Sequence, residues 1–432
     1  MWLSSIRNCL LLLTVGLYLV LNYGFMQVRI PPSTNGVPIG EALLLFMLLT
    51  FNYLALLTKF NQTIPLLPFI LWWGVGIAHA AINFPQYGIW AIRDASHIVE
   101  SLFVLAGFSF IRTENDLEKL AAWLPKVLFF AIGYSLLYPF REVLKPLSPI
   151  LPGAQGQEVT LFFNWTNTAF VLIVSAAFFL QNYFNQSNKR HLYFGVASLA
   201  IAFALFPSRT LILEMFALVA YFVASYRLSL KRILGILAAG ILVIGFVKVW
   251  FVAGASSYGR FAGKGFSFSD YGNLFLEIFG KSDAENTFSS GIEQRFDWWS
   301  SVLTQWRQTW GTMLFGLGYG MPLIDFKNVL SSIVREPHNE LISIFARGGI
   351  IAGVVFIWMQ ALILKRALAV YAYLKNNKQY GGLATALLFI LIFTLIHAIG
   401  ETPFAWAFYV IPYYFSAGVF IHLFAAIPRK SD

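Results

Sequence analysis

The sequence predicts an all-α polytopic membrane protein with about twelve transmembrane helices and an architecture like that of the GT-C membrane glycosyltransferases. Charged residues make up only 12% of the 432 residues, and hydrophobic residues make up 58%. Soluble domains carry about 25% charged residues, so the surface of this chain could not face water all round. This composition excludes an ordinary soluble enzyme, a disordered chain and a coiled coil.

Twelve apolar segments approach the length of about 20 residues that a membrane-spanning helix needs. They are 8–26, 39–57, 63–82, 97–111, 121–140, 159–184, 191–206, 210–226, 233–252, 340–364, 381–399 and 405–426. The first segment is not followed by a small-residue cleavage site, so we interpret it as a retained helix. The chain thus divides into helices one to nine (1–252), a large loop (253–338) and helices ten to twelve (339–432).

The distribution of Lys and Arg predicts that both termini lie in the cytoplasm. With that orientation, fifteen of the 30 basic residues fall on the cytoplasmic side and only five in short outer loops. Orientation is judged from the short loops, because the short cytoplasmic loops of membrane proteins carry an excess of Lys and Arg. The net charge of +10 then indicates contact with anionic membrane lipids and not with nucleic acid.

The sequence of the large outer loop predicts an irregular first part and a helical second part. Residues 254–291 are rich in Gly and Ser. The apolar positions of the second part then recur at steps of three and four residues, as in a helix: Phe296, Trp299, Val302, Leu303, Trp306 and Trp310. An aromatic amphipathic helix of this kind should lie along the membrane interface or pack on the bundle.

Several kinds of chemistry lack their sequence signatures. No Walker-type phosphate loop, HExxH motif or Asp-x-Asp pair occurs, and the six His residues are scattered. The single cysteine, Cys9, rules out an intramolecular disulfide and a cysteine metal site. We therefore predict that the protein uses no cofactor and no metal.

Three arginines lie at predicted junctions between helices and water on the outer side: Arg93, Arg209 and Arg295, which opens the loop helix. The positive-inside rule disfavours arginine in short outer loops, so these positions need a reason. For Arg93 the structural alternative is a salt bridge, because Asp94 and Glu100 lie nearby in the sequence. Guanidinium groups match phosphate oxygens and stay charged, so converging arginines would hold a diphosphate.

The segment Arg335-Glu336-Pro337-His338-Asn339-Glu340 precedes the tenth predicted span. Pro337 fits the first turn of that helix, which would place His338 at the positive end of the helix dipole. The dipole disfavours the imidazolium form, and a neutral imidazole can accept a proton from a sugar hydroxyl. The structural alternative is a polar cluster that caps the helix and has no chemical role.

These residues occur in a pattern that resembles a known family. His338-Asn339, nine residues and then Gly349-Ile350-Ile351-Ala352 is similar to the His-Asn-x9-Gly-x-x-Gly signature of the O-antigen ligase and polymerase superfamily. The order of other features also resembles that family: Ser208-Arg209-Thr210 opens a span, and Arg295 heads an aromatic helix that runs into 314–318. Ala352 departs from the usual second Gly, but its small side chain still permits close helix packing.

The resemblance implies a bacterial inner-membrane enzyme that transfers a glycan from undecaprenyl diphosphate at the periplasmic face. An O-antigen ligase would deliver the polysaccharide to lipid A-core by a metal-independent, inverting reaction. By resemblance His338 is the base, and Arg209 and Arg295 bind the diphosphate. To these we add Arg93, Arg335, Asn339 and Arg347 as candidate substrate-binding residues.

Two other functions stay open at this stage. An O-antigen or capsule polymerase would use the same donor, and a transporter of lipid-linked glycans would need charges inside the membrane. Arg347, Lys248 and Glu214 are the candidates for such charges. His397 and Glu401, one helical turn apart, are interpreted as a structural pair.

Overall fold

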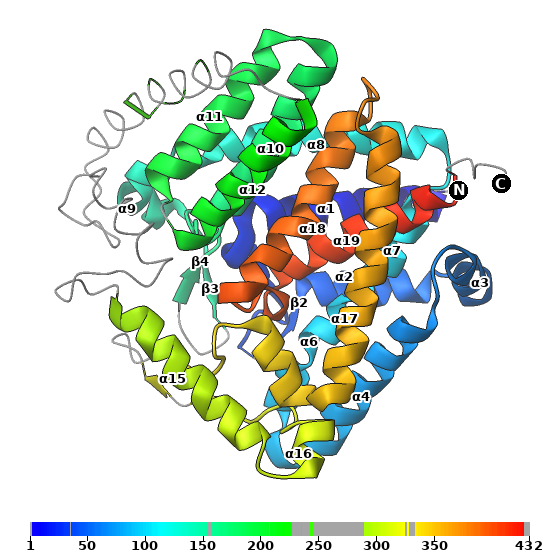
Figure 1. Ribbon diagram of the computed structural model, residues 1–432, viewed down its shortest axis with the longest axis vertical. Helices are drawn as coiled ribbons and strands as arrows, with labels where there is room; N and C mark the ends of the chain where they lie inside the picture. Colours follow the sequence, from blue (N-terminus) through cyan, green and yellow to red (C-terminus); the bar gives the residue numbers. More distant parts are fainter. Residues whose placement is uncertain are drawn as a thin grey trace.

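The computed structural model describes residues 2–34, 36–153, 158–206, 208–226, 289–324, 326–327 and 333–426, with a few single positions between 235 and 245, and it is mostly helical (Figure 1). The helices of the first half are α1 (Trp2–Met26), α2 (Ile39–Leu49), α3 (Tyr53–Thr63), α4 (Leu67–Tyr87), α5 (Ile89–Asp94), α6 (Ser96–Glu100), α7 (Phe103–Phe110), α8 (Glu114–Ser135), α9 (Arg141–Leu144), α10 (Thr168–Gln186), α11 (Lys189–Leu205) and α12 (Arg209–Tyr226). The other α-helices are α15 (Ser289–Trp306), α16 (Trp310–Phe315), α17 (Glu340–Leu374), α18 (Gly381–Gly400) and α19 (Ala407–Phe424). Short 3₁₀ turns are η1 (Tyr138–Phe140), η2 (Lys145–Leu147) and η3 (Pro403–Ala405).

Within the described residues, three small antiparallel strand pairs join some of these helices, where the sequence predicted only α-structure. They pair β1 (Arg29–Ile30) with β2 (Val37–Pro38), β3 (Ile150–Pro152) with β4 (Glu158–Thr160), and β5 (Phe326–Lys327) with β6 (Ile333–Val334). Strands of two or three residues are too short to show the alternation of apolar and polar residues by which a strand is recognised.

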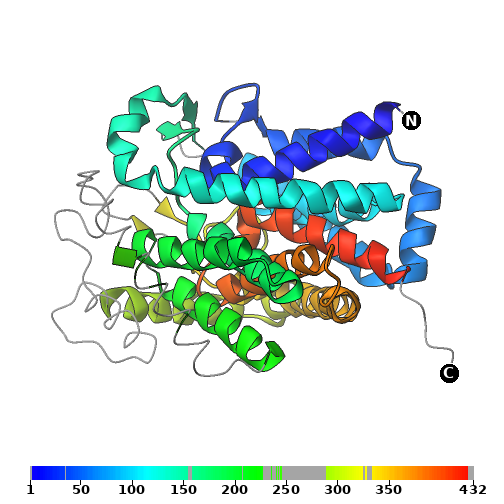
Figure 2. The ribbon, with the colours of Figure 1, turned by 90° about the horizontal axis from the view of Figure 1, so that it is seen from above.

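The helices differ in how much of their surface the protein buries. The apolar windows of α10, α18 and α19 are 78%, 78% and 83% buried, whereas those of α4 and α12 are 22% and 28% buried. The first three therefore form the core of the bundle, and α19 runs through its middle in both views (Figures 1 and 2). The apolar faces of α4 and α12 suit contact with lipid, because hydrocarbon is as apolar as the side chains themselves.

Close packing in the core depends on small residues. A Cβ atom on Gly107 of α7 would lie 2.2 Å from the carbonyl oxygen of Phe415, and one on Gly418 of α19 would lie 2.1 Å from that of Val104. The two backbones thus approach each other at glycines, as is common between membrane helices.

The described residues confirm a multi-pass membrane protein but not the number twelve. Seven described helices are long and apolar enough to cross a membrane, and nine do so if each of two bent helix pairs counts as one span. The predicted span 39–57 is broken into α2 and α3, which bend by 103°. The predicted span 97–111 is divided into α6 and α7, and the ninth predicted span (233–252) lies almost wholly outside the described residues.

The second part of the large loop is helical, as predicted. The helix α15 starts at Ser289, so Arg295 lies inside it and not at its beginning. Val302 of α15 is buried with Leu323, Ile324 and Ala346. The aromatic helix therefore packs on the bundle, beside the start of α17 (Figure 1).

Candidate functional site

The residue His338 lies immediately before α17, in a backbone conformation that is rare for a residue with a side chain. Its φ is +54°, in the left-handed region that few residues other than glycine adopt. The helix begins only at Glu340, and the side chain of Asn339 caps it by accepting the N–H of Ile342 at 3.0 Å. The prediction that Pro337 forms the first helical turn is therefore wrong. Unusual backbone geometry of this kind gathers at functional sites.

Glu401 joins His338 to Arg295. Its carboxylate lies 2.6 Å from Nδ1 of His338 and accepts a hydrogen bond of 2.8 Å from Nη2 of Arg295. Nη1 of Arg295 also donates to the carbonyl oxygen of Gly400 at 2.6 Å. The three side chains come from the turn before α17, the end of α18 and the second turn of α15, so only the folded chain brings them together.

The charge of Glu401 is fixed by these two partners. Burial by itself would raise the pKa of the carboxyl, but the hydrogen bond and charge of His338 and the guanidinium of Arg295 outweigh it and lower the pKa to about 2. Glu401 is therefore ionised near neutral pH and accepts the Nδ1–H of His338. When the imidazole is neutral, this arrangement leaves Nε2 as the nitrogen that can take up a proton.

The aromatic helix holds the segment that carries His338. The ring of Trp298 stacks on the imidazole with centroids 5.8 Å apart and planes inclined by 29°. Nε1 of Trp299 donates to the carbonyl oxygen of Pro337 at 2.7 Å. These contacts restrict the orientation of the imidazole, which a general base requires.

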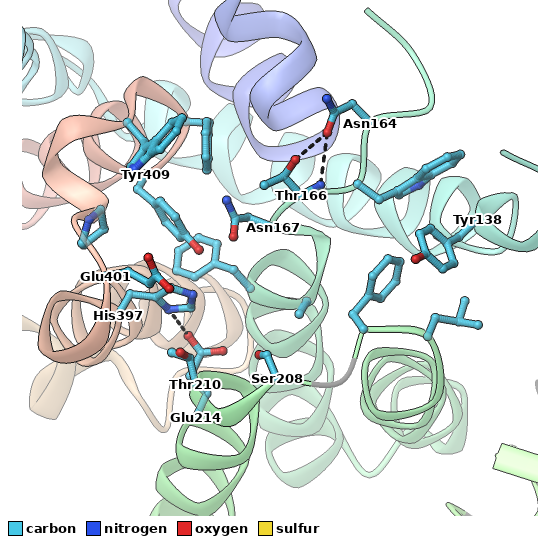
Figure 3. A pocket seen from close by; sticks show the side chains of 18 of the residues that line it. Tyr138, Asn164, Thr166, Asn167, Ser208, Thr210, Glu214, His397, Glu401 and Tyr409 are labelled. Atoms are coloured by element: carbon cyan, nitrogen blue, oxygen red, sulfur yellow. Dashed lines mark hydrogen bonds and ion pairs between the residues drawn. The ribbon is translucent and has the colours of Figure 1, made fainter. Parts of the chain in front are cut away.

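A cavity of about 620 Å³ opens beside this cluster, and Glu401 is part of its wall (Figure 3). Neither His338 nor Arg295 is part of that wall, so Glu401 is the link between the cluster and the cavity. Besides Arg141, Glu214, His397 and Glu401, the wall combines neutral polar groups with aromatic rings: Asn164, Thr166, Asn167, Ser208 and Thr210 with Tyr138, Trp165, Trp406 and Tyr409. Amides and hydroxyls beside aromatic faces suit a polar ligand with apolar faces, such as a sugar.

Arg209 is not part of the cavity wall, but its two neighbours in the sequence are. It opens α12 between Ser208 and Thr210, which both line the cavity, and it is half-buried. The hydroxyl of Ser208 accepts the N–H of Leu211 at 3.1 Å and so caps the helix. A helix N-terminus with an arginine favours anions at that position.

One basic side chain on the cavity wall was not a sequence candidate. Arg141 lines the cavity, and its guanidinium lies 4.6 Å from the ring centre of Tyr138. Its Nε also pairs with Glu142 at 3.3 Å. The sequence placed it only in a short outer loop, with no motif around it.

Arg347 and Arg335 are placed in a separate ion-pair network. Nη1 of Arg347 lies 2.9 Å from the carboxylate of Asp94, and its guanidinium also pairs with Glu336. Nη2 of Arg335 lies 3.2 Å from the same Asp94. Arg347 is buried, and these two carboxylates compensate its charge inside the protein. The role of these two arginines in substrate binding stays a prediction that this arrangement does not favour.

Two further candidates also lie away from the cavity wall. Arg93 donates to the carbonyl oxygen of Thr34 at 3.1 Å and lies over the ring of Trp90. The side-chain amide of Asn339 donates to the carbonyl oxygen of Ile399 at 2.9 Å while its oxygen caps α17. Asn339 thereby ties the start of α17 to the end of α18, next to Glu401.

The pairing of His397 with Glu401 is wrong. Nδ1 of His397 lies 2.7 Å from the carboxylate of Glu214, inside the cavity (Figure 3). Glu401 leaves the helix after Gly400 and turns toward α15 instead. One sequence feature could have pointed to the pairing of Glu401 with His338. In Gly400-Glu401-Thr402-Pro403, an acidic residue ends a predicted span at the same membrane face as His338.

Compared with known proteins, the chain matches no protein-family model and no curated protein sequence significantly. Among the residues that the structure describes, no three His, Cys, Asp or Glu side chains gather as metal ligands would. The fold and site thus define a multi-pass membrane protein with a histidine–carboxylate–arginine cluster at the edge of a polar and aromatic cavity.

Proposed function

We propose that this protein is an O-antigen ligase, which transfers a polysaccharide from undecaprenyl diphosphate to lipid A-core at the periplasmic face of the bacterial inner membrane. The single observation that carries the proposal is the Arg295–Glu401–His338 cluster at the edge of the cavity that the N-terminus of α12 also reaches. The sequence resemblance supplies the substrate class. Both termini would lie in the cytoplasm and the site in the periplasm.

The donor would place its diphosphate near Arg209 and the capped N-terminus of α12. Breaking the bond between the sugar and the diphosphate leaves negative charge on the departing phosphate oxygen. Preorganised positive groups stabilise such charge without reorganising during the reaction. Arg295 contributes less free charge than the sequence suggested, because Glu401 and Gly400 already accept its hydrogen bonds.

His338 would act as the general base. Nε2 takes the proton from the acceptor hydroxyl, the hydroxyl oxygen forms a bond to the anomeric carbon, and undecaprenyl diphosphate leaves with the electron pair of the broken bond. A single displacement of this kind inverts the anomeric centre. Glu401 would stabilise the imidazolium that forms, and a positioned base contributes about 10²- to 10⁴-fold in rate.

A polymerase that uses the same donor is the alternative. The sugar-like character of the cavity wall serves both functions, because both acceptors are saccharides. A transporter is a second alternative. Buried Arg347 is paired with Asp94 and Glu336, which does not suit a transport pathway. Glu214 pairs with His397 in the cavity wall, where charges on a transport pathway are expected.

The test is transfer by the purified full-length protein, supplied with lipid-linked polysaccharide and lipid A-core in the presence of EDTA and without ATP. We expect product from the wild type, a fall in kcat of at least about 10²-fold in His338→Ala, and a raised KM for the donor in Arg209→Ala. His191→Ala is the matched control. His191 lies near the start of α11, which follows the end of α10 that is farthest from the cavity. Full activity of His338→Ala, or no product in EDTA, contradicts the mechanism.

Deletion of the gene distinguishes ligase from polymerase. A missing ligase leaves lipid A-core without O-antigen while lipid-linked polymer accumulates. A core that carries one single repeat identifies a polymerase instead.

A further inference from the structure

Three arginines that do not line the cavity converge at the β1–β2 hairpin and α5. Nη1 of Arg29 and Nη2 of Arg93 both donate to the carbonyl oxygen of Thr34, at 2.8 and 3.1 Å. Arg93 and Arg335 both lie over the ring of Trp90, at 4.8 and 4.0 Å from its centre. Two guanidinium groups therefore share one neutral acceptor, and two share one aromatic ring.

Acidic side chains do not balance this positive charge. Within the described residues, Asp94 and Glu41 act on the cluster. Asp94 is divided between Arg335, Arg347 and the N–H of Gly320, and Glu41 acts on Arg29 through its charge. No carboxylate among the described residues lies within ion-pair distance of Arg93. Burial lowers the pKa of the Arg93 guanidinium, and the charges of Arg29 and Arg335 lower it further, which outweighs the opposite effect of Asp94. Like charges held together in this way favour a bound anion.

Apolar side chains on the same short elements are exposed. Ile30 and Val37 of the hairpin are 55% and 44% exposed, and Ile89 and Ile92 of α5 are 44% and 48% exposed. Exposed aliphatic groups beside arginines are expected where a protein meets the boundary between lipid tails and headgroups. A lipid whose headgroup carries phosphate satisfies both halves of this surface.

We infer that Arg29, Arg93 and Arg335 form a binding site for the phosphate of a membrane lipid headgroup, separate from the cavity at Glu401. The guanidinium groups would bind the phosphate oxygens as forked donors, and the aliphatic residues would contact the acyl chains. The inference does not depend on glycan transfer, because it concerns binding alone.

The experiment is native mass spectrometry of the full-length protein in detergent micelles, titrated with dioleoyl phosphatidic acid, dioleoyl phosphatidylcholine or inorganic phosphate. We expect phosphatidic acid to bind at least about 10-fold more tightly than either other probe. Arg29→Gln and Arg93→Gln should each weaken its binding by about 10-fold or more, as loss of a charged hydrogen bond does. Arg93→Lys should fall between, because it keeps the charge but loses the fork.

Arg190→Gln is the control, since Arg190 is exposed and lies at the start of α11. Arg335 is left unchanged because its ion pair with Asp94 supports the fold, and unfolding temperatures are compared for every variant. Wild-type binding by folded Arg29→Gln and Arg93→Gln overturns the site. Equal binding of inorganic phosphate and phosphatidic acid overturns the assignment to a lipid. Because transfer is not measured, failure here leaves the proposed ligase activity separately testable.

Discussion

At the scale of single residues, Glu401 determines the arrangement of the candidate site. One carboxylate orients the imidazole of His338 through Nδ1 and holds the guanidinium of Arg295 through its other oxygen. A carboxylate that orients a histidine fixes the ring tautomer and stabilises the charge that forms on proton transfer. In the proposed mechanism His338 would therefore depend on Glu401, although the two residues are far apart in the sequence.

The low pKa of Glu401 predicts how stability depends on pH. The carboxyl has a pKa of about 2 in the folded protein and about 4.3 in an unfolded chain. Its ionised form therefore stabilises the fold above about pH 4.3, and this contribution is lost as the pH falls toward 2. We expect Glu401→Gln to unfold at a lower temperature than the wild type at pH 6, and the difference to shrink as the pH falls below about 5.

Thermal unfolding in detergent at several pH values measures the difference in unfolding temperature between the variant and the wild type. The other acidic residues are the same in both proteins, so their titration cancels in this difference. Glu118→Gln is the control, because Glu118 is exposed on α8, and its variant should follow the wild type at every pH. A difference between Glu401→Gln and the wild type that stays constant from pH 6 to pH 3 contradicts the assigned ion pair.

At the scale of elements, the backbone conformation at Gly349 explains why the motif that follows His338 contains a glycine. It breaks α17 with φ +72° and ψ −173°, a conformation that is essentially restricted to glycine. The break frees the carbonyl oxygens of Ala346 and Arg347, which accept the N–H groups of Leu317 and Gly318 at 2.6 and 3.0 Å. The glycine-rich segment after α16 thereby docks against α17.

Gly349→Ala should therefore destabilise the protein. The new Cβ atom would lie 2.1 Å from the carbonyl oxygen of Leu314, and the backbone conformation alone costs about 1–3 kcal/mol. We expect a clear fall in unfolding temperature, measured by tryptophan fluorescence on heating in detergent.

Gly133→Ala provides the control for this change. Gly133 lies in α8 with nothing within 4 Å of the added Cβ atom, and alanine is preferred over glycine in a helix by about 0.5–1 kcal/mol. This variant should be as stable as the wild type or slightly more so. If Gly349→Ala is equally stable, the break in α17 does not need glycine.

The helical elements differ in how well the sequence predicted them. The core helices α10, α18 and α19 coincide with long apolar runs, because burial in protein and burial in lipid both require apolar side chains. The run 39–57 predicts one span, but the chain turns by 103° between α2 and α3. Hydropathy reports which side chains avoid water and not the direction of the backbone, so a sharp bend inside an apolar run leaves no signal.

At the scale of the whole molecule, the distribution of basic residues predicts the orientation, and one cysteine makes it easy to test. Cys9 can be replaced by Ser, and single cysteines can then be introduced at exposed positions: Ser300→Cys on α15 and Asn376→Cys between α17 and α18. We expect a membrane-impermeant maleimide to label only the first in spheroplasts, because α15 should be periplasmic. Labelling of Asn376→Cys alone would reverse the orientation and place the site in the cytoplasm.

The sequence by itself determined that the chain is a helical membrane protein, because composition and apolar run length follow directly from the hydrophobic effect. It also indicated His338, Arg209 and Arg295 as candidate site residues, because their order along the chain resembles that of a known family. Only the tertiary structure decided which charges meet. It assigned Glu401 to His338 and Arg295, His397 to Glu214, and Arg347 to Asp94 and Glu336. Ion pairs between different helices depend on how those helices pack, and sequence spacing carries no record of that distance.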